Sequence, residues 1–426
     1  MREMKDSGIK WIGVIPSAWR TARVKNVAET MQSGGTPDSS NDTFYVDIEG
    51  GIPWVAIADM STTPYVKDTN KHISEEGRKS KNLIVFEPGT ILYAMYASVG
   101  KVSELAVPAT INQALLAIVL NSSIDGSFFK YALNAWEPYI ISESNGTTQF
   151  NLNANKVANL CFPMPNRLEQ ESIVRYLDTK CAQVDTLIAN VEAQIEKLKD
   201  YKQSLITEVV TKGLAPTVPM KDSGVAWIGE IPAHWEIKRG KALFKETEVR
   251  SADGSEELLT VSQYTGITPR SQKNVTMFEA LSLEGYKICE IGDIAANTMW
   301  LWAGAIGVSE YRGVISPSYN VYRQRGNDFI PRYLDHLLRA PMLVQEYASL
   351  STGIRASRLR LYPKDFLNIH FPVPPLEEQQ AILDALSSKC SAVDRLISIK
   401  RAKIEKLEQY KRSLIYEYVT GKREVV

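Results

Sequence analysis

Two stretches of the chain carry apolar residues in alternating steps of four and three, the heptad pattern of a helix that packs on another helix. The first runs from about Arg167 to Lys212 without Pro or Gly, which would make a helix roughly 70 Å long. So narrow a stripe needs a second helix to cover it, and we expect the two stretches to pair. The predicted pairing residues are Val184, Ile188, Val191, Ile195, Leu198 and Leu205 in the first stretch, and Val393, Ile397, Ile404, Leu407 and Leu414 in the second.

Polar residues mark the ends of the first stretch and one interior position of both. Asn166 followed three residues later by Glu169 has the spacing of a capping box, and Gly213 is placed to end the helix. Lys202 and Lys411 occupy the same place in the two stripes. A polar residue there either fixes the register of the pair or extends along its rim into solvent, and the sequence leaves both interpretations open.

The chain also repeats itself. Residues 4–19, MKDSGIKWIGVIPSAW, recur as MKDSGVAWIGEIPAHW at 220–235, and residues 163–211 match 372–420 without a gap. We call these the repeated phrase and the long block. Their order indicates a tandem duplication of a unit of about 210 residues. The Trp residues of the phrase are expected to be packing anchors: Trp11, Trp19, Trp227 and Trp235.

Two variable segments, roughly residues 20–160 and 236–370, lie between the repeated parts and share little sequence. Strand-like runs such as 82–96 and 257–264 alternate with helix-like runs such as 128–140 and 329–349. We therefore predict an α+β fold. Two mixed α/β domains, 1–162 and 216–371, are separated by two long helices, 163–215 and 372–426, that pair as an antiparallel coiled coil with a pseudo-two-fold internal repeat.

Composition and charge exclude some classes of protein. The 426 residues are too many for one ordinary core, and the formal net charge of zero argues against a polybasic tail or a membrane-surface protein. We expect a cytoplasmic protein, since no signal peptide and no apolar run of about 18 residues are visible. The four Cys and four His show no ligand spacing, so no metal site is predicted.

Sequence motifs for catalysis and for cofactors are missing. The chain has no Walker A motif, no GxGxxG after a strand, no HExxH and no Asn-Pro-Pro-aromatic tetrapeptide. Asp59 and Asp293 are expected to be turn residues, and Trp300, Trp302 and Tyr319 to pack in a core. No catalytic residue is therefore predicted, and the two variable segments favour a binding role.

Charge becomes informative when it is sorted along the chain. Between Tyr311 and Lys364 nine residues are basic and three acidic, and eight of the nine are Arg. Arginine suits phosphate and the guanine edge, although a solvated helix face with a loop would give the same pattern. In the first segment neutral hydrogen-bonding residues and a lysine would take this role. The candidate DNA contacts are Arg355, Arg358, Arg360, Arg323, Arg325, Thr147, Thr148, Gln149, Asn151 and Lys101.

The order of these parts resembles the specificity subunit of type I restriction–modification systems. The motifs that carry the resemblance are KDSGxxWxGxIPxxW before each variable segment, GGTP with GGIPW at 34–54, MWLWAGAIGVS within 292–319, TGIRxxRLRLYPxDF at 352–366, and the long block. They span essentially the whole chain, and it is their joint order that is specific.

The resemblance implies a sequence-specific DNA-binding subunit with one target recognition domain for each half of a bipartite, asymmetric site. The paired helices would set the unread spacer and would dock two methyltransferase subunits, and through them two restriction subunits. S-adenosylmethionine, ATP and Mg²⁺ would belong to those partners, and this chain would be a non-catalytic part of a bacterial or archaeal complex that acts in phage defence.

Two other functions are weighed against this one. A single-chain DNA methyltransferase or nuclease is disfavoured because the chain has no cofactor motif. A coiled-coil adaptor without DNA contact would keep its assembly when the arginines at 355, 358 and 360 are reversed in charge.

Overall fold

The computed structural model describes residues 2–47, 50–60, 64–96, 99–143, 152–215, 217–273, 282–353 and 359–425. The chain divides into two compact units. The first unit comprises Met1–Val191 with Arg401–Val426, and the second comprises Glu192–Lys400. Within the part of the chain that is described, no helix is long and apolar enough to cross a membrane.

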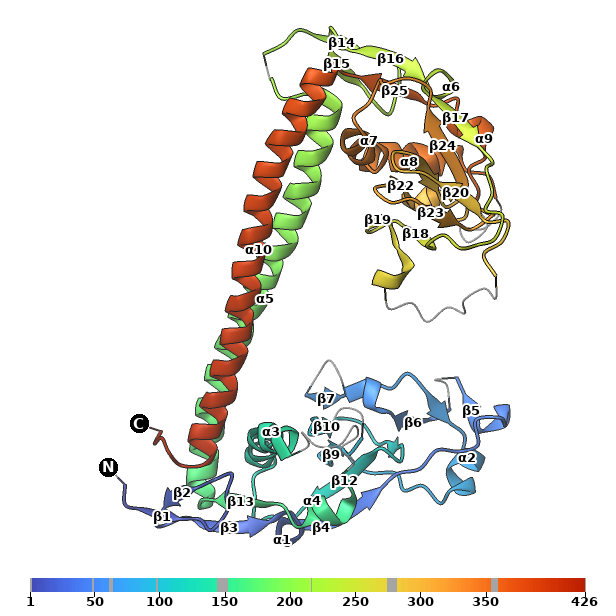
Figure 1. Ribbon diagram of the computed structural model, residues 1–426. Helices are drawn as coiled ribbons and strands as arrows, with labels where there is room; N and C mark the ends of the chain where they lie inside the picture. The colour runs from blue at the N-terminus through green and yellow to red at the C-terminus, as the bar shows by residue number, and fades with distance from the viewer. Residues whose placement is uncertain are drawn as a thin grey trace. The chain divides into compact units, whose positions relative to one another are not determined.

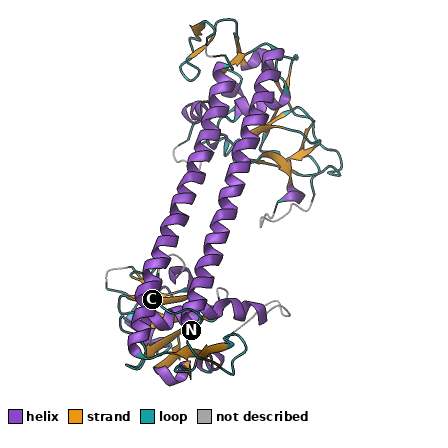
Figure 2. Cartoon of the chain, turned by 90° about the vertical axis from the view of Figure 1, so that its left-hand side faces the viewer, coloured by secondary structure: helices purple, strands orange, loops and turns teal. Residues whose placement is uncertain are grey.

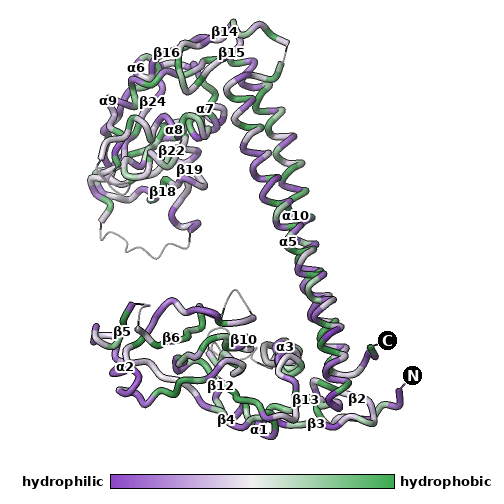
Figure 3. The backbone as a smooth tube through the Cα atoms, turned by 180° about the vertical axis from the view of Figure 1, so that it is seen from behind, coloured by the Kyte–Doolittle hydropathy of each residue, from purple (hydrophilic) through white to green (hydrophobic). Residues whose placement is uncertain are grey.

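Two long helices, α5 (Arg167–Lys212) and α10 (Leu376–Val419), contribute to both units (Figure 1). The predicted cap of α5 is confirmed, because the Asn166 side-chain oxygen accepts from the Glu169 amide at 3.0 Å. The predicted end is confirmed as well, since Gly213 has a φ of +76° directly after the helix. Hydrophobic and hydrophilic residues alternate along both helices (Figure 3), as their heptad pattern requires.

The helix segments lie side by side in each unit (Figure 2), and the contacts between them show that they run antiparallel. In the second unit, Lys202 of α5 donates to Asp394 of α10, and Lys400 of α10 donates to Gln194 of α5. Residue numbers therefore rise along one helix as they fall along the other. In the first unit the Tyr176 and Tyr418 rings lie 4.4 Å apart, and Lys411 contacts Asp185. The predicted antiparallel pairing is thus confirmed.

A five-stranded sheet forms the centre of the first variable segment. Its β10–β7 pair is parallel and its other pairs are antiparallel. The order is β4 (Ala28–Ser33), β12 (Leu115–Leu120), β9 (Ile91–Ala94), β10 (Val102–Leu105), β7 (Tyr65–Val66). A four-stranded sheet beside it has the order β11 (Thr110–Ile111), β6 (Ile52–Val55), β8 (His72–Ile73), β5 (Tyr45–Val46). The helices are α1 (Val24–Val27), η1 (Asp42–Phe44), η2 (Ile57–Met60), α2 (Glu75–Ser80), α3 (Gly126–Glu143) and α4 (Ala154–Ala158).

The second variable segment is centred on an antiparallel four-stranded sheet. Its order is β17 (Phe244–Thr247), β24 (Asn320–Gln324), β21 (Ile294–Ala296), β22 (Ile306–Val308). Two further pairs are β18 (Leu259–Ser262) with β19 (Gly266–Pro269), and β20 (Lys287–Cys289) with β23 (Gly313–Ile315). The helices are α6 (Gly240–Leu243), η3 (Arg270–Gln272), η4 (Leu301–Ala303), α7 (Pro331–Leu338), α8 (Pro341–Leu350) and α9 (Pro363–Phe366).

The repeated phrase forms the same hairpin in both units. Each hairpin is followed by a strand that pairs with the strand just before a long helix. The hairpins are β1 (Met4–Asp6) with β2 (Val14–Pro16), and β14 (Met220–Asp222) with β15 (Glu230–Pro232). The following pairs are β3 (Arg20–Arg23) with β13 (Cys161–Met164), and β16 (Glu236–Arg239) with β25 (His370–Val373). The predicted fold class and internal repeat are confirmed.

The Trp residues of the phrase anchor these hairpins to the long helices. The indole N–H of Trp19 donates to the Glu169 carboxylate at 3.1 Å, and that of Trp235 donates to Glu378 at 2.9 Å. Trp19, Trp227 and Trp235 are buried, whereas Trp11 is half-buried. Each unit therefore has a core that joins the phrase, one recognition segment and both long helices.

Candidate nucleic-acid interface

The central sheets of the two variable segments have the same strand order. β4-β12-β9-β10 in the first corresponds to β17-β24-β21-β22 in the second. The turn before β9 and the turn before β21 each place a glycine in the left-handed region, Gly89 at +89° and Gly292 at +87°. The sequences barely resemble each other, so this correspondence shows that one backbone plan presents two different sets of surface residues.

Three candidate arginines of the second segment lie in or beside the motif TGIRASRLR. Arg355 and Arg358 fall outside the described residues. Arg360 is half-buried, and its guanidinium donates to the Leu359 carbonyl at 2.8 Å. The backbones of Thr352 and Arg360 exchange two hydrogen bonds of 2.9 Å, which hold the two ends of this segment together.

The other two candidate arginines are engaged in the fold. Arg323 donates from Nε and Nη2 to both oxygens of Asp293, each at 2.7 Å, and the Asp293 side chain is only 2% exposed. The Asp293 carboxylate raises the pKa of the Arg323 guanidinium. Arg325 donates from Nε to the Phe244 carbonyl at 3.1 Å. The Nε–Nη2 edge of the Arg323 guanidinium is therefore already occupied by Asp293.

Asp59 lies in the short 3-10 helix η2, and Asp293 lies in the turn before β21; each accepts a hydrogen bond from a backbone amide three residues earlier. Asp59 accepts from the Ala56 amide at 2.8 Å, and Asp293 accepts from the Glu290 amide at 2.9 Å. Asp293 combines this turn role with its ion pair to Arg323, a contact that residue spacing could not reveal.

In the first segment, the candidate contacts Thr147, Thr148, Gln149 and Asn151 lie outside the described residues. Leu152 is the next described residue, and its amide donates to the Met95 carbonyl at 3.2 Å. That places Leu152 beside the loop between β9 and β10.

Lys101 lies in that same loop and is exposed. Burial raises the pKa of the Glu137 carboxyl, and the positive charges of Arg412 and Lys101 act in the opposite direction. Lys101 is thus the one candidate of the first segment that is described, and it is exposed.

The aromatic residues of the second segment differ from expectation in one case. Tyr319 is half-buried and accepts from the Asn297 amide at 2.9 Å, and Trp302 is half-buried. Trp300, which the sequence places in a core, is 49% exposed, so that prediction is wrong. The loop between β21 and β22 turns at η4, where buried Leu301 takes the inward position and leaves Trp300 outside.

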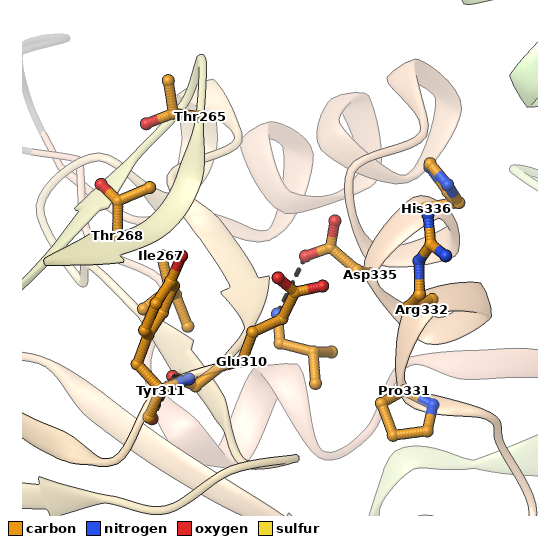
Figure 4. Close-up of a pocket in the computed structure, with 11 residues that line it drawn as sticks. Thr265, Ile267, Thr268, Glu310, Tyr311, Pro331, Arg332, Asp335 and His336 are labelled. Atoms are coloured by element: carbon orange, nitrogen blue, oxygen red, sulfur yellow. Dashed lines mark hydrogen bonds between the residues drawn. The ribbon is translucent and has the colours of Figure 1, made fainter. Parts of the chain in front are cut away.

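A cavity of about 270 Å³ lies between β19, the end of β22 and α7 (Figure 4). Asp335 accepts from the Val308 amide at 2.9 Å, and burial lowers the pKa of His336. The lining is mostly polar, with Thr265, Thr268, Glu310, Tyr311, Arg332, Asp335 and His336. The sequence gives no sign of this cavity because its residues come from three separated stretches. Among the described residues no cluster of His, Cys, Asp or Glu could hold a metal ion.

The predicted helix-pairing residues of α5 and α10 are all buried or half-buried. Ile188, Leu198, Ile404 and Leu407 are half-buried. The remaining seven are buried: Val184, Val191, Ile195, Leu205, Val393, Ile397 and Leu414.

The two lysines of the seam form matching ion pairs across it. Lys202 bonds Asp394 at 2.7 Å in the second unit, and Lys411 bonds Asp185 at 2.7 Å in the first. Each lysine therefore has a specific partner on the opposite helix, which favours the register interpretation over simple extension into solvent.

Comparison with known proteins gives a consistent result. The family model for the type I restriction modification DNA specificity domain matches residues 16–197 and 235–409. The type I restriction enzyme MjaVIII specificity subunit of Methanocaldococcus jannaschii is 25% identical over 430 residues, 96% of this chain and 93% of that protein. The EcoBI specificity subunit of Escherichia coli is 21% identical, over 96% of this chain and 87% of its own length.

A solved structure has a similar fold. It comes from work on complex assembly and conformational transition of the type I restriction–modification system. The two chains superpose with a TM-score of 0.63 at 16% identity, covering 96% of this chain and 99% of the other.

Proposed function

This chain belongs to the type I restriction modification DNA specificity family, and from that membership we propose how its two units divide the recognition of DNA. It is a specificity subunit of a type I restriction–modification system with two recognition domains. We assign the first recognition domain to residues 1–162 and the second to residues 216–371, with the helices 163–215 and 372–426 between and after them.

Each recognition domain contacts one half of a bipartite, asymmetric DNA site. One observation carries this proposal: the domains share a strand order but differ in the residues that their loops present. A common backbone lets both dock on a duplex in the same way, and different loops recognise different bases. The free-energy penalties for wrong bases in the two half-sites then add, at about 1–3 kcal/mol for each wrong base pair.

The paired helices set the length of the spacer that is not recognised. Helices joined by a fixed register make a stiff connection, and the matching pairs of Lys202 with Asp394 and Lys411 with Asp185 support a single register.

The helices also dock two copies of a methyltransferase subunit, which bring two restriction subunits into the complex. Large apolar side chains are exposed at corresponding positions of the two long blocks, Leu187 with Leu396 and Tyr201 with Tyr410. Exposed apolar residues that a duplication has kept in both copies suit one partner that binds twice.

Catalysis resides in those partners, which bring S-adenosylmethionine, ATP and Mg²⁺, and the complex acts on DNA in the cytoplasm. The near-zero net charge of this chain supports a division of labour in which the partners supply further phosphate contacts.

Gel-shift titration of the chain, with and without its methyltransferase subunit, tests the proposal. We expect weak binding by the chain alone and tight, site-specific binding by the complex. Equal affinity in the two titrations would contradict it. If the purified chain bound S-adenosylmethionine by itself, a single-chain methyltransferase would become the better assignment.

Reversing Arg355, Arg358 and Arg360 to Glu separates DNA recognition from a purely structural adaptor. We expect the triple variant to assemble with the methyltransferase but to lose methylation of DNA. An adaptor without DNA contact would keep both assembly and methylation.

A further inference from the structure

Both recognition domains expose an aromatic side chain at the same place in the fold. The loop between β9 and β10 holds Tyr96, which is 36% exposed, and the loop between β21 and β22 holds Trp300, which is 49% exposed. β9 and β21 occupy the same position in the two sheets, and so do β10 and β22. The loops differ in length and sequence, so an exposed aromatic in both is a shared property of otherwise divergent segments.

The loop of the second domain holds Trp300 in a fixed position. Asn297 and Thr298 anchor its start, because the Asn297 side chain donates to the Tyr319 hydroxyl at 2.9 Å and the Thr298 hydroxyl donates to the Ser318 carbonyl at 2.7 Å. At its end, Gly304 has a φ of +86°, and an added Cβ there would lie 3.1 Å from Val344 on α8. The loop is thus tied to the residues just before β24 and packed closely on α8.

Trp300 forms one half of an aromatic pair. Its ring stacks on that of Trp302, with 5.7 Å between centroids and 26° between planes. The Trp302 indole donates to the Met299 carbonyl at 3.0 Å, which fixes the inner ring of the pair. Trp302 therefore supports one face of Trp300, while about half of the Trp300 surface stays in water.

The loop of the first domain is anchored in a similar way. Met95, the residue before Tyr96, is buried, and its amide donates to the Ala114 carbonyl at 2.9 Å. Its carbonyl accepts from Leu152, which directly follows Asn151, the last of the candidate contacts of this domain. Exposed Lys101 lies in the same loop. In the second domain, α8 packs on η4 and leads into the segment of Arg355 and Arg358.

We propose that each recognition domain stacks this aromatic side chain, Tyr96 in the first and Trp300 in the second, on a nucleobase of the half-site that it contacts. The inference rests on the proposed function. A flat ring held rigidly in water loses little conformational entropy on binding, and stacking on a base recovers about 1–3 kcal/mol in single-stranded complexes. Aromatic and apolar side chains inserted at a base step also kink the duplex.

The aromatic contact is insensitive to sequence, since every base has a π face. It therefore explains why the same feature occurs in two domains with different specificities. The stacked ring would position a base step, while the adjacent variable residues distinguish the bases.

The test uses the complex of this chain with its methyltransferase subunit and a duplex carrying the site mapped by sequencing methylated adenines. Titration of the duplex is expected to quench tryptophan emission. The Trp300→Phe variant should lose most of that quenching but bind within about threefold of the unaltered complex, because Phe can still stack. Trp300→Ala should bind about tenfold more weakly, the loss expected for one stacked base.

A duplex altered only in the second half-site should no longer quench Trp300. Tyr96→Ala should weaken contact with the first half-site alone, seen as a 2-aminopurine signal that changes there and not in the second half-site. Tyr264→Ala is the matched control, because Tyr264 is 81% exposed in the same domain but on another hairpin. We expect it to bind as the unaltered complex does.

Three results would overturn the stacking. The first is unchanged affinity and quenching in Trp300→Ala, and the second is equal weakening of binding by Tyr264→Ala. The third is loss of the methyltransferase subunit from Trp300→Ala during purification, which would show that the aromatic pair contacts a protein and not DNA. Binding by the unaltered complex that ignores the sequence of the duplex would instead contradict the proposed function itself, and with it this inference.

Discussion

The two recognition domains use the same backbone plan with different chemistry at equivalent positions. The residue after the left-handed glycine is Thr90 in the first domain and Asp293 in the second, and both are buried. Thr90 satisfies its hydroxyl locally, by donating to the Glu87 carbonyl at 2.7 Å. Asp293 instead carries a charge that Arg323 must balance. The backbone of this turn is the same in both domains, whereas the buried polar side chains of Thr90 and Asp293 are satisfied by different partners.

The difference teaches which parts of such a protein are free to change. The phrase hairpin depends on residues present in both copies, whereas the shared strand order is formed by two segments of different sequence. The loops depend on contacts inside one domain only, so each domain can change its surface without disturbing the other.

Exchange of a whole variable segment is expected to have the largest effect. Replacing residues 236–370 with the equivalent segment of another family member should change one half of the methylated site completely and leave the other half unchanged. The reason is that the second domain builds its own sheet and core. Sequencing of methylated adenines measures the outcome, and a change in both halves would show that the domains are not independent.

Arg323→Gln separates a structural arginine from a DNA contact. It leaves the buried Asp293 carboxylate without its cation, which should cost about 2–3 kcal/mol of unfolding free energy, less than a fully buried pair because Arg323 is 40% exposed. Calorimetric unfolding measures it. Adding Asp293→Thr, which copies Thr90 of the first domain, should restore most of the loss. Unchanged stability combined with weaker DNA binding would make Arg323 a DNA contact instead.

The glycines that end the long helices should differ in their tolerance of alanine. Both have positive φ, which costs an alanine about 1–2 kcal/mol. At Gly421 an added Cβ would lie 2.5 Å from the rigid Pro16 ring. At Gly213 it would lie 2.8 Å from Oε1 at the end of the longer Glu378 side chain, whose other oxygen accepts from Trp235.

We therefore expect Gly421→Ala to lower the free energy of unfolding by about 2–4 kcal/mol and Gly213→Ala by about 1–2 kcal/mol. Urea titration gives both values. A loss at Gly213 equal to that at Gly421 would mean that the two junctions are packed with equal rigidity.

The matching ion pairs of the helices should show the smallest effect and should be alike. Double-mutant cycles on Lys202 with Asp394, and on Lys411 with Asp185, should each give a coupling of about 0.3–1 kcal/mol, because the groups are partly exposed. Added salt should reduce both couplings. A coupling in only one unit would show that the register is set at one end.

The long helices were predictable because heptad spacing, a capping residue and a terminal glycine are local signals. Asn166 and Gly213 act where the sequence places them. The common strand order was not predictable, since pairs such as β17 with β24 join residues far apart in the chain. The partner of Arg323 and the exposure of Trp300 depend on those same pairings. Residue spacing therefore identifies both residues as candidates but does not predict which residues surround them.

The second unit is one continuous stretch of chain, whereas the first is assembled from stretches on either side of it. The core of the first unit joins Ile12, Ile15 and Trp19 to Leu414, Ile415, Tyr418 and Val419. A ribosome that adds about 5–20 residues per second needs roughly 10–45 s to pass from Val191 to Leu414. The first unit therefore cannot complete this core until the whole second unit has been translated, although its N-terminal residues leave the ribosome first.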